Sequence, residues 1–222
     1  MRYFVAEIGA DVGIAHDGDA DGVMLVDAQG NEIDGDVVET VCAIDLKQRD
    51  LLPGNTAVST VMCNLGLTHA LRDAGIELIQ TKVGDRYVLE AMRKGGFVVG
   101  GEQSGHMIFL EHNSTGDGLV TALQFLAACK RAGKSVEDAA SVMTRFPQTL
   151  INVKVQDKHA VDGNDVVQAA VRAAEDALGD SGRVLLRPSG TEPVVRVMVE
   201  AASAEDAERH AAAIAAVVER EV

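Results

Sequence analysis

Apolar and amphipathic stretches alternate along the first two thirds of the chain. The first ten residues are typical of the end of a helix, and residues 28–35 are typical of a turn. "VGIAH" predicts a short buried strand, and the alternation as a whole predicts an α/β layer around a mostly parallel sheet. The expected strands are 12–16, 23–27, 56–61, 76–81, 96–101 and 106–111, and the expected helices are Val37–Lys47, Leu65–Ala74, Asp85–Arg93 and Gly118–Arg131.

The pattern changes after Lys134. "KSVEDAASVM" predicts a short amphipathic helix, Pro147 interrupts the chain, and residues 149–157 alternate as a half-exposed strand does. A small α+β unit is expected from there, with its boundary near Arg145–Gln148. Its predicted elements are a helix at Asn164–Ala177, strands at 183–188 and 194–201, and an Ala-rich helix that runs to the C-terminus.

The first helix and strand are too small to form a domain, because a lone strand needs a sheet to join. Two explanations remain open: the segment extends the following domain, or the chain is the back part of something longer. If no other chain covers "VGIAH", we expect an exposed apolar edge and a tendency to associate.

Composition and charge narrow the class of protein. The chain has 222 residues, of which 47% are hydrophobic and 24% charged, as in ordinary globular proteins. A formal net charge of −14 disfavours nucleic acid or an anionic membrane as the main partner. No apolar run reaches the length of a membrane span, and the first residues lack a signal-peptide pattern. Cys42, Cys63 and Cys129 are widely spaced, which favours buried thiols and a cytoplasmic enzyme or binding protein.

Three alternating aspartates define the aspartate loop, Asp17–Gly22. Asp17, Asp19 and Asp21 can direct their carboxylates toward one point, and hard cations such as Mg²⁺ and Ca²⁺ prefer oxygen ligands. A calcium loop of the EF-hand type is disfavoured, because Ala28 stands where a bidentate glutamate is needed and the flanks predict strands. An acidic surface turn is the plainer alternative.

A second polar cluster follows a predicted buried strand in the GEQSGH loop, Gly101–His106. Ligands bind at strand ends in α/β sheets. Glu102 can accept hydrogen bonds from sugar hydroxyls, Ser104 can donate one, and His106 can transfer a proton. A polar loop with a merely hydrogen-bonded histidine is an equal alternative.

A third cluster is the RPSGTE loop, Arg187–Glu192. Its guanidinium, hydroxyls and exposed amides are the groups that bind phosphate, and Arg196 can add a second charge. The candidate residues are Arg187, Ser189, Gly190, Thr191 and Arg196, with an ordinary Ser-Gly hairpin turn as the alternative. Lys82 and Arg86 flank Gly84 in the KVGDR turn, Lys82–Arg86, where both can meet an anion; solvated basic residues are the alternative there.

In this order and spacing the four motifs resemble the α-D-phosphohexomutase family, whose loops read D-G-D-x-D-R, G-E-x-S-G-H and R-x-S-G-T-E-P. The wording "TKVGDRYV", "GGEQSGH", "TGDG" and "LLRPSGTEP" is most similar to the phosphoglucosamine mutase branch. The resemblance runs from about Val12 to the final helix. It implies a three-layer α/β domain followed by a small α+β C-terminal domain.

The resemblance also implies residue roles. Asp17, Asp19 and Asp21 would hold Mg²⁺, Glu102 and Ser104 would read sugar hydroxyls, and Lys82 and His106 would lie near the transferred phosphate. Arg86, Arg187, Ser189, Gly190, Thr191 and Arg196 would bind the phosphosugar substrate. Residues 1–35 would be the end of the family's second domain with the metal loop, 36–145 the third, sugar-binding domain, and 146–222 the fourth, phosphate-binding domain.

Two departures from the family pattern bear on activity. The family's nucleophile lies in a T-x-S-H-N-type motif, which these residues lack, and the family arginine after the third aspartate is Gly22 here. The expectation is a glucosamine-phosphate isomerase that is truncated or split and inactive alone, with a separate chain carrying the phosphoserine half. The alternative is a non-catalytic hexose-phosphate-binding remnant or a regulatory partner of a full-length mutase.

Overall fold

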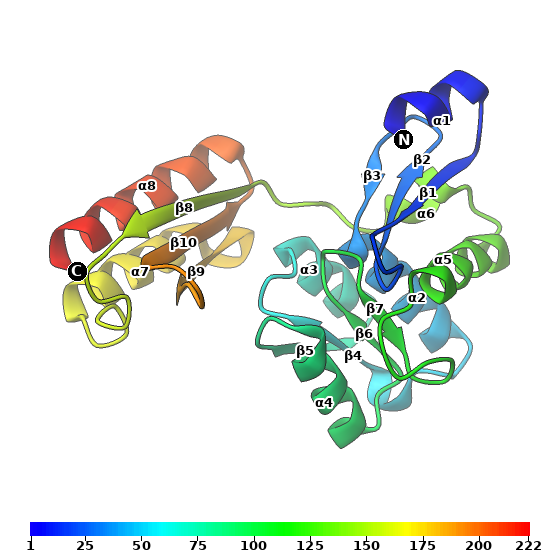
Figure 1. Cartoon of the computed structure of the whole chain (residues 1–222), viewed down its shortest axis with the longest axis horizontal. Helices are drawn as coiled ribbons and strands as arrows, with labels where there is room; N and C mark the ends of the chain where they lie inside the picture. Colours follow the sequence, from blue (N-terminus) through cyan, green and yellow to red (C-terminus); the bar gives the residue numbers. More distant parts are fainter. The chain divides into compact units, whose positions relative to one another are not determined.

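The computed structural model describes all residues, Met1–Val222. The chain divides into unit 1, Met1–Thr144, and unit 2, Arg145–Val222 (Figure 1). The helices of unit 1 are α1 (Arg2–Ile8), α2 (Gly35–Gln48), the 3₁₀ turn η1 (Pro53–Asn55), α3 (Leu65–Asp73), α4 (Asp85–Gly95), α5 (Gly118–Ala132) and α6 (Val136–Ala140). Its strands are β1 (Val12–His16), β2 (Val23–Asp27), β3 (Glu32–Ile33), β4 (Thr56–Thr60), β5 (Glu77–Thr81), β6 (Val99–Gly101) and β7 (Met107–Phe109).

A four-stranded sheet with the order β5-β4-β6-β7 forms the centre of unit 1. β4 is parallel to both β5 and β6, and β7 returns antiparallel to β6, which confirms a mostly parallel sheet. Successive residues face opposite sides: Ala57 and Met107 belong to the core under α2, α3 and α5, whereas Val58 and Ile108 pack with α4. The unit is therefore the expected three-layer α/β domain.

A second, antiparallel sheet joins β1, β2 and β3, and α5 packs against its first two strands. The prediction of a buried first strand is wrong in its burial, because β1 is the edge strand of this sheet and Ile14 is 41% exposed. β3 lies inside a segment predicted as a turn. The Asp27 carboxylate accepts hydrogen bonds from the amides of Gln29 and Asn31, which closes the turn and allows β3 to pair with β2.

Side-chain caps fix where the helices of unit 1 begin. Asp34 accepts a hydrogen bond from the amide of Val37, so α2 starts at Gly35, two residues before the predicted start. Asn64 caps α3 and Asp117 caps α5 in the same manner. No helix combines the length and the apolar character that a membrane crossing requires.

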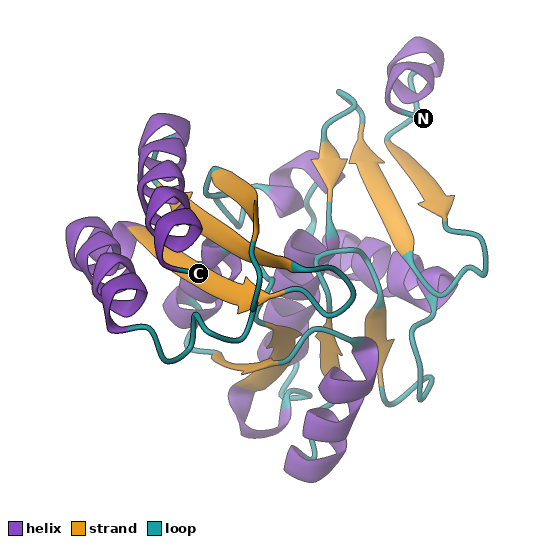
Figure 2. Ribbon diagram, turned by 60° about the vertical axis from the view of Figure 1, so that its left-hand side comes forward, coloured by secondary structure: helices purple, strands orange, loops and turns teal.

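Unit 2 is the expected small α+β unit (Figure 2). Its elements are β8 (Gln148–Lys154), α7 (Asp165–Leu178), the 3₁₀ turn η2 (Gly179–Ser181), β9 (Gly182–Pro188), β10 (Val194–Ala201) and α8 (Ala204–Glu221). The strands form an antiparallel sheet with the order β8-β10-β9, and α7 and α8 lie side by side on one face of it. Val195, Val197 and Val199 of β10 face these helices, so Arg196 lies on the opposite face.

Candidate functional site

Backbone contacts join the aspartate loop to the GEQSGH loop. The amide of Val23 donates to the carbonyl of Gly105 at 3.2 Å, and Gly22 pairs with His106 as an antiparallel bridge. Gly105 has a φ of 99°, and a Cβ there would lie 2.1 Å from the carbonyl oxygen of Val23. Only glycine allows this close approach, so Gly105 is required for the two loops to lie together.

Three potential metal ligands meet where the loops touch. His106 Nε2 lies 3.2 Å from Asp17 Oδ2 and 3.0 Å from Asp21 Oδ1, and the ligand atoms of all three residues lie within 4.8 Å of one another. Asp19 is exposed and lies outside this group. Ser104 Oγ lies 2.9 Å from His106 Nδ1, so the serine hydroxyl and the imidazole are held together.

The environment shifts the two clustered carboxyl groups in opposite directions. The amide of Gly22 donates to Asp17 Oδ1, and this hydrogen bond lowers the pKa of Asp17, with His106 acting in the same direction. Burial is the main cause that raises the pKa of Asp21, and the neighbouring carboxylates of Asp19 and Asp17 add to it. A cation placed between the two groups would favour the ionised form of both.

The donor set fits magnesium in its chemistry. Mg²⁺ usually takes one or two carboxylates and keeps several water molecules. Asp17 and Asp21 supply two carboxylates at one point, and their side chains are 40% and 38% exposed, which leaves access for water. His106 contributes a nitrogen next to them, and it contacts both carboxylates in this structure.

Glu102 connects the GEQSGH loop to the KVGDR turn. Its Oε1 accepts a hydrogen bond from the amide of Gly84 at 3.0 Å. Lys82 is exposed, two residues before Gly84 in the chain. Arg86 points its guanidinium to Glu90 on its own helix at 3.0 Å, and that hydrogen bond raises the pKa of Arg86. The structure thus brings Glu102 to the turn, while Arg86 forms an exposed ion pair that contributes little to stability.

In unit 2, two arginines face each other across neighbouring strands. Arg187 of β9 and Arg196 of β10 are register partners. Burial, and secondly the charge of Arg196, lower the pKa of Arg187. Arg196 Nη2 donates to Glu192 Oε2 at 3.2 Å, but Arg196 Nε is buried with no hydrogen-bond partner. Like charges opposite each other are unfavourable in a sheet, so this pair has the character of an anion site.

The RPSGTE loop connects these two strands. Ser189 is buried, and its hydroxyl accepts a hydrogen bond from the amide of Glu192 at 3.3 Å, while Gly190 and Thr191 are exposed at the tip. Lys158 donates to the carbonyl of Ser189 at 2.6 Å, a contact that sequence reasoning missed. Nothing near Lys158 in the sequence marks it, because the contact spans 31 residues.

The fold is that of an α/β protein with a small α+β unit after it, and comparisons with known proteins identify the family. A sequence profile of phosphoglucomutase/phosphomannomutase alpha/beta/alpha domain III matches residues 34–146, and that of the C-terminal domain matches residues 150–217. The chain therefore belongs to the phosphoglucomutase/phosphomannomutase family of α-D-phosphohexomutases, which confirms the resemblance and the fold class.

Curated relatives support the same family assignment. Phosphoglucosamine mutase of Frankia alni is 55% identical over 218 residues, which are 98% of this chain and 48% of that protein. The phosphoglucosamine mutase of Bacillus licheniformis is 52% identical over 222 residues, 100% of this chain and 50% of that protein. The chain thus spans about half the length of the curated relatives that it matches.

The crystal structure of Aspergillus fumigatus N-acetylphosphoglucosamine mutase in complex with GlcNAc-6P and magnesium superposes with a TM-score of 0.80. The two chains are 22% identical, and the match covers 94% of this chain and 52% of that chain. At this identity the likeness is one of fold.

Proposed function

We propose that the chain binds hexosamine phosphates and supplies the substrate-reading part of a phosphoglucosamine mutase, which interconverts glucosamine 6-phosphate and glucosamine 1-phosphate. The observation that carries the proposal is the junction of the aspartate loop with the GEQSGH loop. It places two carboxylates and His106 beside Ser104 in one unit. The names of the relatives support the choice of an amino sugar. Cys42, Cys63 and Cys129 are buried free thiols, which favours the cytoplasm.

Each loop has a role in this proposal. Asp17 and Asp21 would hold Mg²⁺, which when bound neutralises charge on a transferring phosphoryl group, and Asp19 would join them as a third ligand by turning its exposed side chain toward the ion. Glu102 keeps one carboxylate oxygen at the Gly84 amide and has its second oxygen for a sugar hydroxyl. Ser104 can donate to the neighbouring hydroxyl.

The charged side chains would act on the phosphates. His106 can carry a proton at Nε2, and Lys82 and Arg86 would contact the reacting end of the substrate. Arg187, Arg196 and the exposed amides of Gly190 and Thr191 would bind the phosphate that is not reacting. Residues 1–35, 36–145 and 146–222 would correspond to the end of the second, the third and the fourth domain of a mutase.

Binding of glucosamine 6-phosphate to the purified chain tests the proposal. Isothermal titration is expected to show binding that strengthens with Mg²⁺. Glu102→Ala should weaken it by about tenfold or more, because a hydrogen bond to a charged group contributes roughly 1.5–3 kcal/mol. Glu111→Ala is the matched control, since Glu111 is exposed and lies outside the loops described above.

The titration also distinguishes the substrate-binding part of a mutase from a remnant that has lost sugar binding. Magnesium-dependent binding with the Glu102 effect supports an intact substrate half. No binding at millimolar ligand would contradict the proposal and favour the alternative of a remnant that no longer reads the sugar.

The phosphoryl donor is proposed to come from a chain that carries a T-x-S-H-N segment. Helix α1 and strand β1 present an apolar face that such a chain could cover: Tyr3 is 92% exposed, Phe4 61%, and Ile8 and Ile14 are also exposed. Faces of this kind are typical of interaction surfaces. We expect the 222-residue chain to show no mutase turnover by itself and to gain turnover when a chain with that segment is added. Turnover by the pure chain would contradict the expectation.

A further inference from the structure

The backbone of the GEQSGH loop rests on the N-terminus of helix α2. The amide of Gly35, the first residue of the helix, donates to the carbonyl of Gln103 at 3.0 Å. A Cβ at position 35 would lie 2.0 Å from the carbonyl oxygen of Glu102 and 2.9 Å from the amide nitrogen of Gly105. The loop therefore sits directly on the helix, with no room for a side chain between them.

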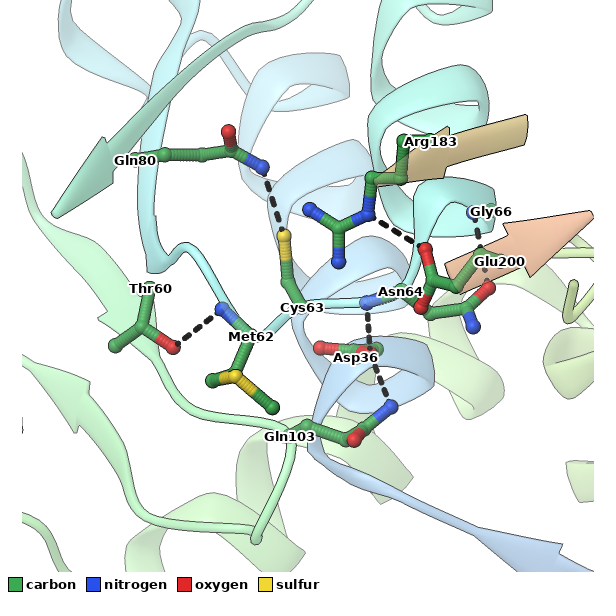
Figure 3. A network of polar contacts seen from close by, with 10 residues as sticks. All are labelled: Asp36, Thr60, Met62, Cys63, Asn64, Gly66, Gln80, Gln103, Arg183 and Glu200. Carbon is green, nitrogen blue, oxygen red and sulfur yellow. Dashed lines mark hydrogen bonds and ion pairs between the residues drawn. The ribbon is translucent and has the colours of Figure 1, made fainter. Parts of the chain in front are cut away.

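The next residue, Asp36, connects three segments through one oxygen atom. Asp36 Oδ2 accepts a hydrogen bond from Gln103 Nε2 at 2.9 Å and another from the amide of Asn64 at 2.7 Å (Figure 3). Gln103 belongs to the GEQSGH loop, and Asn64 is the N-cap of α3. The carboxylate thus holds the loop to the N-terminal ends of α2 and α3, which cover the same face of the sheet.

The burial of Asp36 makes this arrangement costly. Its exposed fraction is 0%, and Glu39, one turn further along the same helix face, is also completely buried. A buried carboxylate is unfavourable unless hydrogen bonds compensate for the lost hydration. The bonds from Gln103 and Asn64 provide that compensation, and they depend on the loop keeping its present position.

We propose that Asp36 is a positioning residue for sugar recognition: through Gln103 it holds the GEQSGH loop so that Glu102 and Ser104 face the substrate. The role in recognition rests on the proposed function. Gln103 lies between the two sugar-reading residues, so fixing its side chain fixes the backbone on both sides. Glu102 has a second anchor at the Gly84 amide, whereas Ser104 contacts only the His106 ring of its own loop. Ser104 is therefore the residue that depends most on Asp36.

Gln103→Met tests the proposal without removing the buried carboxylate. Methionine has a similar length but no amide, so the bond to Asp36 is lost while the fold is retained. We expect binding of glucosamine 6-phosphate to weaken about tenfold. Hydrogen exchange at the amides of Gly35 and Gly105, which the loop protects, should become about tenfold faster in the ligand-free chain.

A polarity swap distinguishes positioning from general damage. In Asp36→Asn with Gln103→Glu, a side-chain amide nitrogen in the place of Asp36 Oδ2 can donate to the new carboxylate at 103, but it gives up the bond from the amide of Asn64, because that one oxygen accepts both bonds in the wild type. Gln103→Glu alone sets two carboxylates against each other and should be impaired, whereas Asp36→Asn alone keeps an oxygen that can accept both bonds. The double variant should recover at least half of the affinity that Gln103→Glu loses, on a logarithmic scale, and the slow exchange. Glu39→Gln is the control, because it removes a buried acid from the same helix face without touching the loop.

Three kinds of outcome would contradict one of the two proposals. Unchanged exchange and affinity in Gln103→Met, or a swap that recovers neither, would overturn the proposal. Faster exchange with unchanged affinity would also overturn it, because the loop would then be mobile without consequence for recognition. If the wild-type chain binds no glucosamine 6-phosphate, the proposed function fails, and exchange at Gly35 and Gly105 alone decides whether Asp36 positions the loop.

Discussion

Arg187→Ala is expected to weaken binding of glucosamine 6-phosphate by at least about a hundredfold. A guanidinium can form two parallel hydrogen bonds with a phosphate, and each charge-assisted bond contributes roughly 1.5–3 kcal/mol. A loss of about 2.8 kcal/mol corresponds to a factor of about 100 in the dissociation constant. Titration calorimetry of the whole chain measures this change.

The same variant is expected to be no less stable than the wild type in phosphate-free buffer. Arg187 faces Arg196 across the sheet, and its pKa is lowered by burial and by that neighbouring charge, so the folded state gains nothing from its ionisation. Wild-type unit 2 should be stabilised by added phosphate, and the variant should not, because only a folded site binds the anion. Thermal melts with and without phosphate provide the measurement.

Arg172→Ala is the matched control for the loss of one positive charge. Arg172 is exposed on α7 and belongs to none of the loops assigned to the substrate. The control should keep both the affinity and the response to phosphate. A large loss of melting temperature in Arg187→Ala without phosphate would contradict our interpretation, since it would make Arg187 a structural residue.

Glu39→Gln is expected to stabilise unit 1 at neutral pH and to change how its stability depends on pH. Glu39 has an exposed fraction of 0%, and neither carboxyl oxygen forms a hydrogen bond of ordinary geometry, although the nearby Ser59 hydroxyl acts to lower its pKa. Burial, and secondly the charge of Asp36, raise the pKa of Glu39 well above its ordinary value. The folded chain therefore keeps this proton at pH values where the unfolded chain has lost it.

The sign of the effect follows from proton linkage. Because the pKa is raised in the folded state, the contribution of Glu39 is fully present below its ordinary pKa and is lost as the pH rises toward the folded pKa. One proton gives a slope of at most about −1.4 kcal/mol per pH unit in that window. Urea unfolding at several pH values should show this slope in the wild type and a shallower one in Glu39→Gln.

Glu77→Gln is a suitable control for this measurement. Glu77 is the first residue of β5 and is exposed, so its replacement should leave the free energy of unfolding within about 0.5 kcal/mol. An identical pH dependence in Glu39→Gln and the wild type would show that Glu39 is ionised in the folded protein.

The sequence allowed the prediction of those parts of the site that lie within one short segment. The alternation of Asp17 and Asp21 indicates a cation site, and the structure brings these two residues together with His106. The ligand set could not be predicted from spacing alone, because it depends on Gly105 packing against Val23, more than 80 residues away in the chain. Asp19 shares the spacing but lies outside the cluster.

Contacts between distant segments account for most of what the sequence did not reveal. Asp36 resembles an ordinary residue of a helix start, and only the fold places it under Gln103. Lys158 lies in a polar stretch with no motif around it, and its contact with Ser189 depends on where β9 and β10 place the RPSGTE loop. The sequence of β1 is as apolar as that of a buried strand, but β1 is the edge strand of its sheet and is partly exposed. The burial of an edge strand depends on what packs beside it, which its own sequence does not specify.

Gly22 affects the evolutionary paths that are open to this chain. A Cβ at this position would lie 2.7 Å from Asp17 Oδ2 and 3.2 Å from His106 Nε2. Restoring the arginine of the D-G-D-x-D-R pattern would therefore require the Asp17 carboxylate to turn away from its present contact with the imidazole. Replacing Gly22 by arginine is therefore not a neutral step. A lineage carrying this glycine would regain the arginine most easily after a compensating change at Asp17 or His106.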